Sequence, residues 1–325
     1  SKYMTGYIVT RDKYGDWCVP PEGPLLIHAK DSSRLTDGQL IATAYYHKML
    51  AYLQRFAGLL NKKEDAKVFG LLMDSIRMAF NKKFYDVNKK LYSNNTATAN
   101  LLPLYFGLVP DSLKLAIFDK IRQKILVENN GHTSTGLIGS QWLMRTLSDY
   151  GSTDVAYTLT TNTTYPSWGY MVANGATTIW ELWNGNTANP GMNSQNHVML
   201  LGDLLTWYYE NLAGIRSDKT EVAFKKIIMK PGLPTDLEFV NASYNSFHGL
   251  IRSDWKKTAE NFEWNVTIPA NTSAVIHVPA RSVSDVTESG RELSKTEGVQ
   301  IVKWENGSAI LQAGSGQYKF TSKIK

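Results

Sequence analysis

A segment from Gly175 to His197 carries the residue types best suited to chemistry in this chain. It places the carboxylate of Glu181 between two tryptophans, Trp180 and Trp183, and brings an imidazole, His197, to the start of an apolar helical run. Indole faces stack on the apolar C–H faces of a pyranose, and a carboxylate in that setting can take a proton from water. The pattern favours a sugar-cleaving site. The alternative is a loop Glu181 that caps a helix beside two core tryptophans.

Backbone geometry distinguishes the two tryptophans. If the segment is extended, successive side chains point to opposite faces, so Trp183 shares a face with Glu181 and Trp180 points away. We therefore expect Trp183, rather than Trp180, to lie near the pocket. We expect His197 to donate to a sugar hydroxyl or to orient Glu181. The alternative for a single histidine at the start of a helix is a structural role.

An early Tyr-Gly-Asp-Trp sequence, at residues 14–17, adds two candidates. A glycine-assisted turn there would let Asp16 hold sugar hydroxyls or position water, and Trp17 would serve as a platform for the sugar. For Asp16 an Asx turn that satisfies its own backbone is an equal alternative, and for Trp17 the alternative is a core position. Two weaker candidates for the mouth of the pocket are Glu22, in the loop that follows, and His132.

Composition limits the other classes of chemistry. The single cysteine, Cys18, excludes an intramolecular disulfide framework and a cysteine-based zinc site. The six histidines are scattered, and there is no HExxH, GxGxxG or P-loop motif, so we expect neither a metal nor a cofactor.

Charge and hydropathy exclude further partners. The formal charge of +6 comes from dispersed lysines rather than from a continuous basic tract, so we expect no nucleic-acid partner. No apolar run approaches the roughly 20 residues that span a membrane. No secretion signal is visible at the N-terminus, and the compartment is left open.

The elements that must position these residues begin with a helical half. From Leu35 to Leu212 apolar residues recur at helical spacing, and short loops rich in Gly, Asn, Ser and Pro separate about eight helices in pairs. The expected helices lie at residues 40–60, 68–79, 97–108, 110–128, 136–150, 153–162, 166–174 and 194–212. Paired helices of this kind indicate an α/α toroid or a helical bundle.

After Gly214 the pattern changes to short, alternating segments rich in Val, Ile, Phe, Tyr and Trp, separated by turn sequences such as Pro-Gly and Asn-Gly. The expected strands lie at residues 223–229, 237–244, 249–254, 262–268, 273–278, 299–305, 308–312 and 316–321. They indicate an antiparallel sandwich or a jelly-roll-like domain. A boundary near Ala213 divides the chain into residues 1–213 and 214–325.

Helical hairpins followed by a β-sandwich, with GATTIWELWNG and PGMNSQNH closing the helical part, resemble the bacterial α-L-rhamnosidases of glycoside hydrolase family 78. The match includes the segments at residues 14–17, 132–143, 165–171 and 214–231. It implies a partial (α/α)6 toroid of helical hairpins, followed by a C-terminal antiparallel β-sandwich, and thus the C-terminal portion of such an enzyme. It also implies inverting hydrolysis of terminal α-L-rhamnose in a rhamnose-containing glycan or glycoside.

The resemblance assigns roles residue by residue. Glu181, in the GATTIWE sequence, corresponds to the general base that activates water. His197, in the MNSQNH sequence, looks like a sugar-contacting residue of the same pocket, and Trp17 looks like part of its aromatic wall. The resemblance implies no cofactor.

The departure from the family pattern is equally informative. The family's general acid lies in a DxxxRDExxxW motif upstream of the GDW sequence, and no such string occurs here. An (α/α)6 barrel has twelve helices, against about eight in this sequence. We therefore expect a chain that starts partway through the catalytic domain and is inactive by itself because it lacks the acid. We also expect an exposed apolar edge that promotes self-association.

Two alternatives stay open. The first is another (α/α)6 glycosidase or a phosphorylase, which would replace the base with phosphate-binding Arg, His or Ser/Thr groups. The second is a carbohydrate-binding fragment without catalysis.

Overall fold

The computed structural model describes residues 2–23, 25–188 and 194–325 and divides into two compact units, Ser1–Asp203 and Leu204–Lys325. Residues 190–193 of the PGMNSQNH motif lie outside the described residues. Within the described residues no helix has the length and apolar character to cross a membrane.

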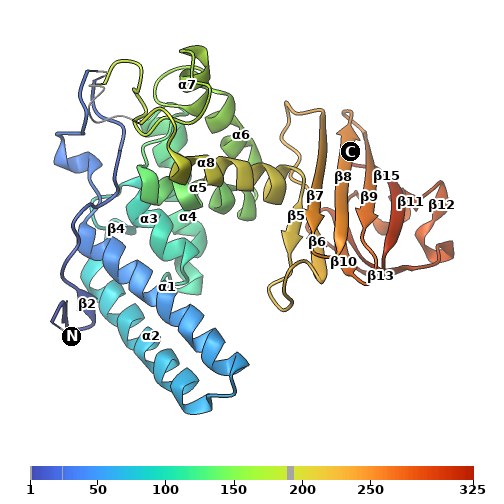
Figure 1. Ribbon diagram of the computed structural model, residues 1–325, viewed down its shortest axis with the longest axis horizontal. Helices are drawn as coiled ribbons and strands as arrows, with labels where there is room; N and C mark the ends of the chain where they lie inside the picture. The colour runs from blue at the N-terminus through green and yellow to red at the C-terminus, as the bar shows by residue number, and fades with distance from the viewer. Residues whose placement is uncertain (1, 24, 189–193) are drawn as a thin grey trace. The chain divides into compact units, whose positions relative to one another are not determined.

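Helical hairpins build the first unit, as predicted (Figure 1). The helices are α1 (Gly38–Leu59), α2 (Lys63–Phe84), α3 (Ala97–Tyr105), α4 (Lys114–Gln123), α5 (Leu137–Asp149), α6 (Thr153–Thr161), α7 (Trp168–Ala173) and α8 (Val198–Trp207). Each of the eight expected segments overlaps one of them, although α2 is ten residues longer than the segment expected for it. Two segments are less regular than predicted, because α4 and α8 pass into π-helical turns at Lys124–Glu128 and Tyr208–Leu212. Short hairpins pair β1 (Met4–Thr5) with β2 (Ile8–Val9) and β3 (Tyr85–Asp86) with β4 (Leu91–Tyr92).

The starts of α1, α3 and α5 lie at one end of the helical unit. Asp37, a residue type favoured at the start of helices, caps α1 by accepting the N–H of Gln39 at 2.8 Å. Thr96 caps α3, and its hydroxyl lies 2.6 Å from that of Thr36, just before α1. Helix α5 follows Gly136, which offers no side chain for a cap. The N–H groups at the start of α5 must therefore find an acceptor elsewhere.

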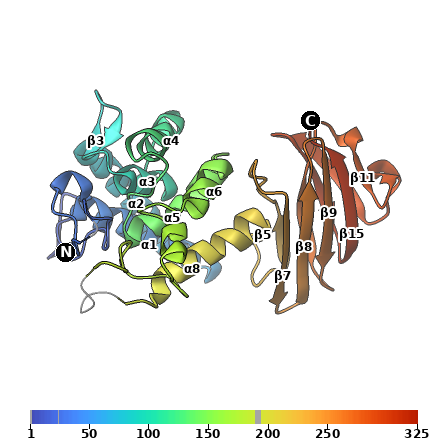
Figure 2. The same cartoon turned by 90° about the horizontal axis from the view of Figure 1, so that it is seen from above.

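A sandwich of two sheets forms the second unit. Its strands are β5 (Ile215–Ser217), β6 (Lys226–Met229), β7 (Phe239–Ser246), β8 (Gly249–Lys257), β9 (Asn261–Ile268), β10 (Ser273–Pro279), β11 (Val286–Glu288), β12 (Arg291–Glu292), β13 (Val299–Glu305), β14 (Ser308–Ala313) and β15 (Gly316–Lys323). One sheet has the order β13-β14-β10-β6-β5 and the other β12-β11-β15-β9-β8-β7. Figure 2 shows β7, β8, β9 and β15 side by side in the second sheet.

Buried side chains from both sheets form one core, which includes the indoles of Trp255 and Trp264 and the ring of Phe320. All eight expected strands are present. The pairing is antiparallel, as predicted, except between β6 and β10, which run parallel. Alternation along a strand shows which face is buried, and it contains no information about the direction of the neighbouring strand.

Candidate active site

Glu181 lies where two short segments run side by side. Its backbone N–H donates to the carbonyl oxygen of Ser194 at 2.8 Å, and the N–H of His197 donates to the carbonyl oxygen of Ile179 at 2.8 Å. In return, the N–H of Ser194 donates to Oε2 of Glu181 at 3.0 Å. The two backbone hydrogen bonds place Glu181 and His197 on neighbouring stretches of backbone.

The indole of Trp17 approaches Glu181 from a distant part of the chain. Its Nε1–H donates to Oε1 of Glu181 at 3.4 Å, so each carboxylate oxygen receives one N–H. Both side chains are half-buried. The ring of Trp17 also contacts the rings of Tyr14 and His28, with centroids 5.9 and 4.9 Å away. Since each oxygen of a carboxylate has two acceptor positions, Glu181 keeps the capacity to accept a proton from water.

His197 keeps a free polar atom. Its Nδ1 is buried and has no hydrogen-bond partner within the described part of the chain. Buried polar atoms in folded proteins are normally paired, so an unpaired ring nitrogen on the segment that is hydrogen-bonded to that of Glu181 is suited to a ligand hydroxyl.

Asp16 is the cap that α5 lacks in its own sequence. Oδ1 accepts the N–H groups of Ile138 at 2.8 Å and Gly139 at 3.0 Å, and Oδ2 accepts the N–H of Gly136 at 3.0 Å and the hydroxyl of Thr98 at 2.5 Å. The side chain is 6% exposed. Burial raises the pKa of this carboxyl group, and the four donors oppose that rise. Because protein donors occupy both oxygens, the structure favours a capping role over a sugar contact.

The glycines of the TSTGLIG sequence allow this close approach. A Cβ at Gly136 would lie 2.3 Å from the carbonyl oxygen of Trp17, and a Cβ at Gly139 would lie 2.2 Å from the hydroxyl of Thr98. Both positions therefore need glycine for space rather than for a special backbone angle. The sequence contained this signal, since two glycines three residues apart at the start of a helix indicate close packing. Thr98 carried no comparable signal.

A small apolar cluster joins the two motifs. Cys18, which follows Trp17, packs with Leu182 and Ala188, which follow Glu181. Burial raises the pKa of the Cys18 thiol to about 12, and the nearby carboxylates of Glu181 and Asp16 add to the rise. The thiol therefore stays protonated at neutral pH and acts as a small apolar side chain.

The two tryptophans beside Glu181 are both buried. Trp183 is 2% exposed, donates its Nε1–H to the carbonyl oxygen of Thr135 at 3.2 Å and packs edge-on against Trp168. The backbone turns at this point, because the N–H of Gly185 bonds the carbonyl oxygen of Leu182 at 3.1 Å. The assumption of an extended segment is therefore wrong. Alternation along an extended strand therefore does not place Trp183 on the same face as Glu181. The burial of Trp183 favours a position in the core instead.

The two weaker candidates have structural partners. Glu22 accepts the backbone N–H groups of Lys30 and Asp31, at 3.0 and 2.5 Å, within an exposed loop. His132 has partners at both ring nitrogens, Asn129 at 2.9 Å and Thr164 at 2.7 Å. Neither residue contacts Glu181 or Trp17 through a hydrogen bond that the described structure shows.

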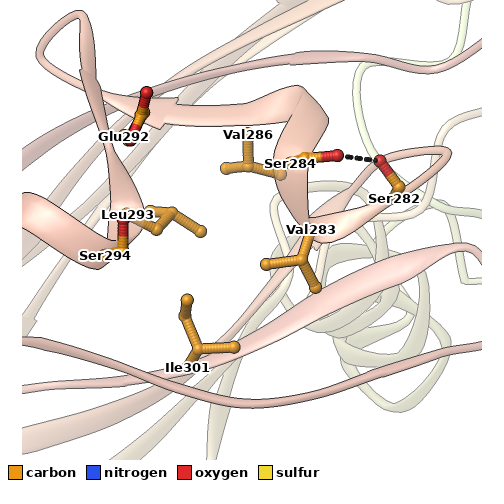
Figure 3. Close-up of a pocket in the computed structure, with 8 residues that line it drawn as sticks. All are labelled: Ser282, Val283, Ser284, Val286, Glu292, Leu293, Ser294 and Ile301. Carbon is orange, nitrogen blue, oxygen red and sulfur yellow. Dashed lines mark hydrogen bonds between the residues drawn. The ribbon is translucent and has the colours of Figure 1, made fainter.

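A recess of about 530 Å³ also lies in the β-sandwich (Figure 3). Four aliphatic side chains form half of its wall: Val283, Val286, Leu293 and Ile301. The carboxylate that lines it, Glu292, pairs with Lys295 at 2.9 Å. None of its lining residues is aromatic, so this recess lacks the stacking surface that the Glu181 site has. Across the described residues, no cluster of three or more His, Cys, Asp or Glu side chains could hold a metal ion.

Comparisons with known proteins agree with this arrangement. A family model described as the bacterial alpha-L-rhamnosidase 6 hairpin glycosidase domain matches residues 2–212, and the model of the bacterial alpha-L-rhamnosidase C-terminal domain matches residues 214–292. An alpha-L-rhamnosidase of Streptomyces avermitilis is 32% identical over 98% of this chain and 29% of its own length. One from Alteromonas sp. (strain LOR) is 35% identical over 94% of this chain and 32% of its own length.

Solved structures show the same likeness. The S. avermitilis alpha-L-rhamnosidase, crystallised with L-rhamnose, superposes with a TM-score of 0.87 at 31% identity, over 99% of this chain and 29% of that one. The alpha-L-rhamnosidase from Dictyoglumus thermophilum superposes with a TM-score of 0.86 at 35% identity, over 98% of this chain and 34% of that one. The chain spans about a third of the length of these relatives. It belongs to the bacterial α-L-rhamnosidase family, and its residues match that family's six-hairpin glycosidase domain and then its C-terminal domain.

Proposed function

We propose that this chain supplies the base half of an inverting glycosidase that hydrolyses terminal α-L-rhamnose, and that Glu181 is its general base. The hydrogen bond from Trp17 to Glu181, together with the Ser194 N–H on the other oxygen, carries the proposal. It joins a half-buried carboxylate to an aromatic ring that can stack on a sugar. The complex of the S. avermitilis relative with L-rhamnose supports rhamnose as the sugar.

In this mechanism the chemistry divides between two carboxyl groups. Glu181 takes a proton from a water molecule while the water oxygen attacks the anomeric carbon. On the other face of the sugar an acid gives a proton to the leaving oxygen as the glycosidic bond breaks. The indole of Trp17 stacks on the apolar face of the sugar and orients Glu181, and Nδ1 of His197 bonds a sugar hydroxyl.

The acid is the part of the mechanism that residues 1–325 do not identify. Inverting enzymes separate the two carboxyl groups by roughly 6.5–9.5 Å so that water fits beside the sugar. We expect the acid within the length of the full enzyme that this chain does not match, since the relatives are about three times as long. Residues 1–213 then form part of the catalytic domain and residues 214–325 the β-sandwich. The reaction needs no cofactor.

The geometry argues against a phosphorylase. Such an enzyme needs cationic or hydroxyl groups to hold phosphate where a hydrolase holds its base. In the described structure, the hydrogen bonds to the carboxylate of Glu181 come from an indole and a backbone amide.

The test compares the full-length gene product with its Glu181→Gln variant on 4-nitrophenyl α-L-rhamnoside. Removing a general base lowers kcat by roughly 100- to 10,000-fold with little change in KM. The matched control is Glu64→Gln, which makes the same change at an exposed position of α2. Proton NMR of the first product should show the β-anomer of rhamnose, as inversion requires.

Two results would contradict the proposal. Wild-type kcat in Glu181→Gln would exclude this residue as the base, and initial release of the α-anomer would exclude inversion. Titration of L-rhamnose into residues 1–325 by calorimetry tests the binding-only alternative separately, because that alternative predicts sugar binding but no hydrolysis by the full-length gene product.

A further inference from the structure

We propose that Asp16 is a positioning residue that fixes the indole of Trp17 against the Glu181 carboxylate by tying the intervening backbone to the start of α5. The inference deepens the proposed function and rests on it for its catalytic consequence. Asp16 makes no hydrogen bond to Glu181 among the described residues, and it acts through its neighbour in the sequence, Trp17.

Four hydrogen bonds hold the Asp16 carboxylate rigidly. Its four donors come from two different helices, Thr98 from α3 and the N–H groups of Gly136, Ile138 and Gly139 from the beginning of α5. A carboxylate with two bonds at each oxygen cannot rotate without losing several of them at once. It therefore holds its own backbone in one place relative to both helices.

The backbone of Trp17 is itself hydrogen-bonded to α5. The N–H of Leu137, the first residue of α5, donates to the carbonyl oxygen of Trp17 at 2.6 Å. Cys18, which follows, is anchored in the apolar cluster with Leu182. With the chain held on both sides, the orientation of the Trp17 ring depends on two side-chain torsions, and its Nε1–H reaches Oε1 of Glu181.

Capping α5 with the buried carboxylate of Asp16 has an energetic cost. A cap of α5 needs only a short polar side chain at the position before the helix, such as Ser or Asn. Instead, Gly136 occupies that position and a buried carboxylate from a segment 120 residues away does the capping. No ion pair neutralises Asp16 in the described structure, so the backbone dipoles of α5 carry the compensation. Burying a charge is costly unless hydrogen bonds compensate it, so this cap is stable only while the donors from α3 and α5 stay in place around Asp16.

Asparagine cannot replace Asp16 in this role. Both oxygens accept backbone N–H groups, so the amide nitrogen of asparagine faces at least one N–H donor in either orientation. Asp12 offers the matched control in the same loop. Its Oδ1 alone accepts the N–H groups of Tyr14 at 2.9 Å and Gly15 at 2.6 Å, and an asparagine retains both bonds.

The first experiment observes Trp17 directly in the full chain labelled with ¹⁵N-tryptophan. Nine tryptophans give nine indole N–H signals, and Trp17→Phe identifies that of Trp17. Glu181→Gln should move this signal because its acceptor changes. Asp16→Asn should move or broaden it too, while Asp12→Asn leaves it in place and the sandwich indoles of Trp255 and Trp264 stay unchanged in every variant.

The second experiment measures kcat and KM on 4-nitrophenyl α-L-rhamnoside with the full-length gene product. A displaced base costs rate rather than affinity, so Asp16→Asn should lower kcat roughly 10- to 100-fold with KM within about threefold. In the Trp17→Phe background the same substitution should add less than about twofold, because the two residues act in series.

The results separate the two proposals. An unchanged Trp17 signal and kcat in Asp16→Asn, or effects of Asp16→Asn and Trp17→Phe that multiply, would overturn the positioning role. If Asp16→Asn does not fold, Thr98→Val removes one of the four donors and should move the Trp17 signal less but in the same way, whereas no movement overturns the proposal. Full activity in Glu181→Gln defeats the proposed base alone, and the Trp17 signal still decides the role of Asp16.

Discussion

Replacing Gly136 by alanine should destabilise the helical unit through a single steric conflict. A Cβ at this position would lie 2.3 Å from the carbonyl oxygen of Trp17 and 2.5 Å from that of Asp16. Gly136 has φ −85° and ψ −159°, which any residue can adopt. The penalty therefore comes from contact with backbone atoms that cannot rotate away, and not from an unfavourable backbone angle.

The magnitude follows from the bonds that the added methyl group breaks. The turn at residues 14–17 must move by about 1 Å to restore ordinary contact distances. This displaces two bonds, from the N–H of Leu137 to the carbonyl oxygen of Trp17 at 2.6 Å and from the N–H of Gly136 to Oδ2 of Asp16 at 3.0 Å. A neutral bond contributes about 1 kcal/mol and a bond to a charged group about 1.5–3 kcal/mol. The free energy of unfolding should therefore fall by about 2.5–4 kcal/mol.

Urea unfolding followed by circular dichroism at 222 nm measures this loss, because the signal is dominated by the helices. Gly58→Ala is the matched control: Gly58 is exposed in α1, and an added Cβ meets no atom within 4 Å. That variant should gain up to about 1 kcal/mol from helix propensity. If Gly136→Ala stays within about 0.5 kcal/mol of the wild type, the size of an ordinary surface change, then the turn at residues 14–17 is not held against α5 as described.

Two further predictions concern charge and surface. Burial raises the pKa of Asp203 from 3.8 to about 6 against the opposing effect of Arg145, so the folded state binds this proton more tightly than the unfolded state. The stability it contributes is present below about pH 4 and is lost as the pH rises through 6. Asp203→Asn should therefore stabilise the chain at pH 7.5, by about 1 kcal/mol after allowance for partial exposure, and not at pH 4; equal thermal shifts at both pH values would contradict this. An exposed apolar stripe runs along α1, formed by Met49, Tyr52, Leu53 and Phe56. We expect residues 1–325 to self-associate through it, and Phe56→Glu to weaken the association in sedimentation equilibrium, whereas Val222→Glu in the other unit should not; a wild-type chain that is monomeric at all concentrations would exclude the idea.

Local patterns predicted the elements of this protein well, because helix and strand periodicity reflect which side of each element is buried. The Asp37 cap, for example, is a property of neighbouring residues and was predictable. The parallel pairing of β6 with β10 was not, since it depends on the path of the chain between them. Strands β11 and β12 have only three and two residues, too few for any alternation to show.

In the candidate site, too, features that depend on neighbouring residues were predictable, and features that depend on distant contacts were not. The motifs around Glu181, Trp17 and His197 could be found in the sequence because their residue types and spacing are unusual. The expectation for Trp183 depended on an extended backbone, and the turn at residues 182–185 removed that basis. For Asp16 the sequence left two alternatives, and neither included the start of a helix 120 residues away.

The order of residues along the chain was enough to indicate a helical part followed by a β-sandwich, the eight α-helices, the eight strands of four or more residues in the sandwich and the family resemblance. It also indicated the carboxylate on which the proposed function depends. Those properties are local, since they depend on residues a few positions apart. The three-dimensional fold was needed to see that Trp17 meets Glu181, that Asp16 joins Thr98 to the start of α5, and that Gly136 and Gly139 leave room for the link. Hydrogen bonds across 82 and 164 residues of chain exist only once packing has brought their partners together, here to 2.5 and 3.4 Å.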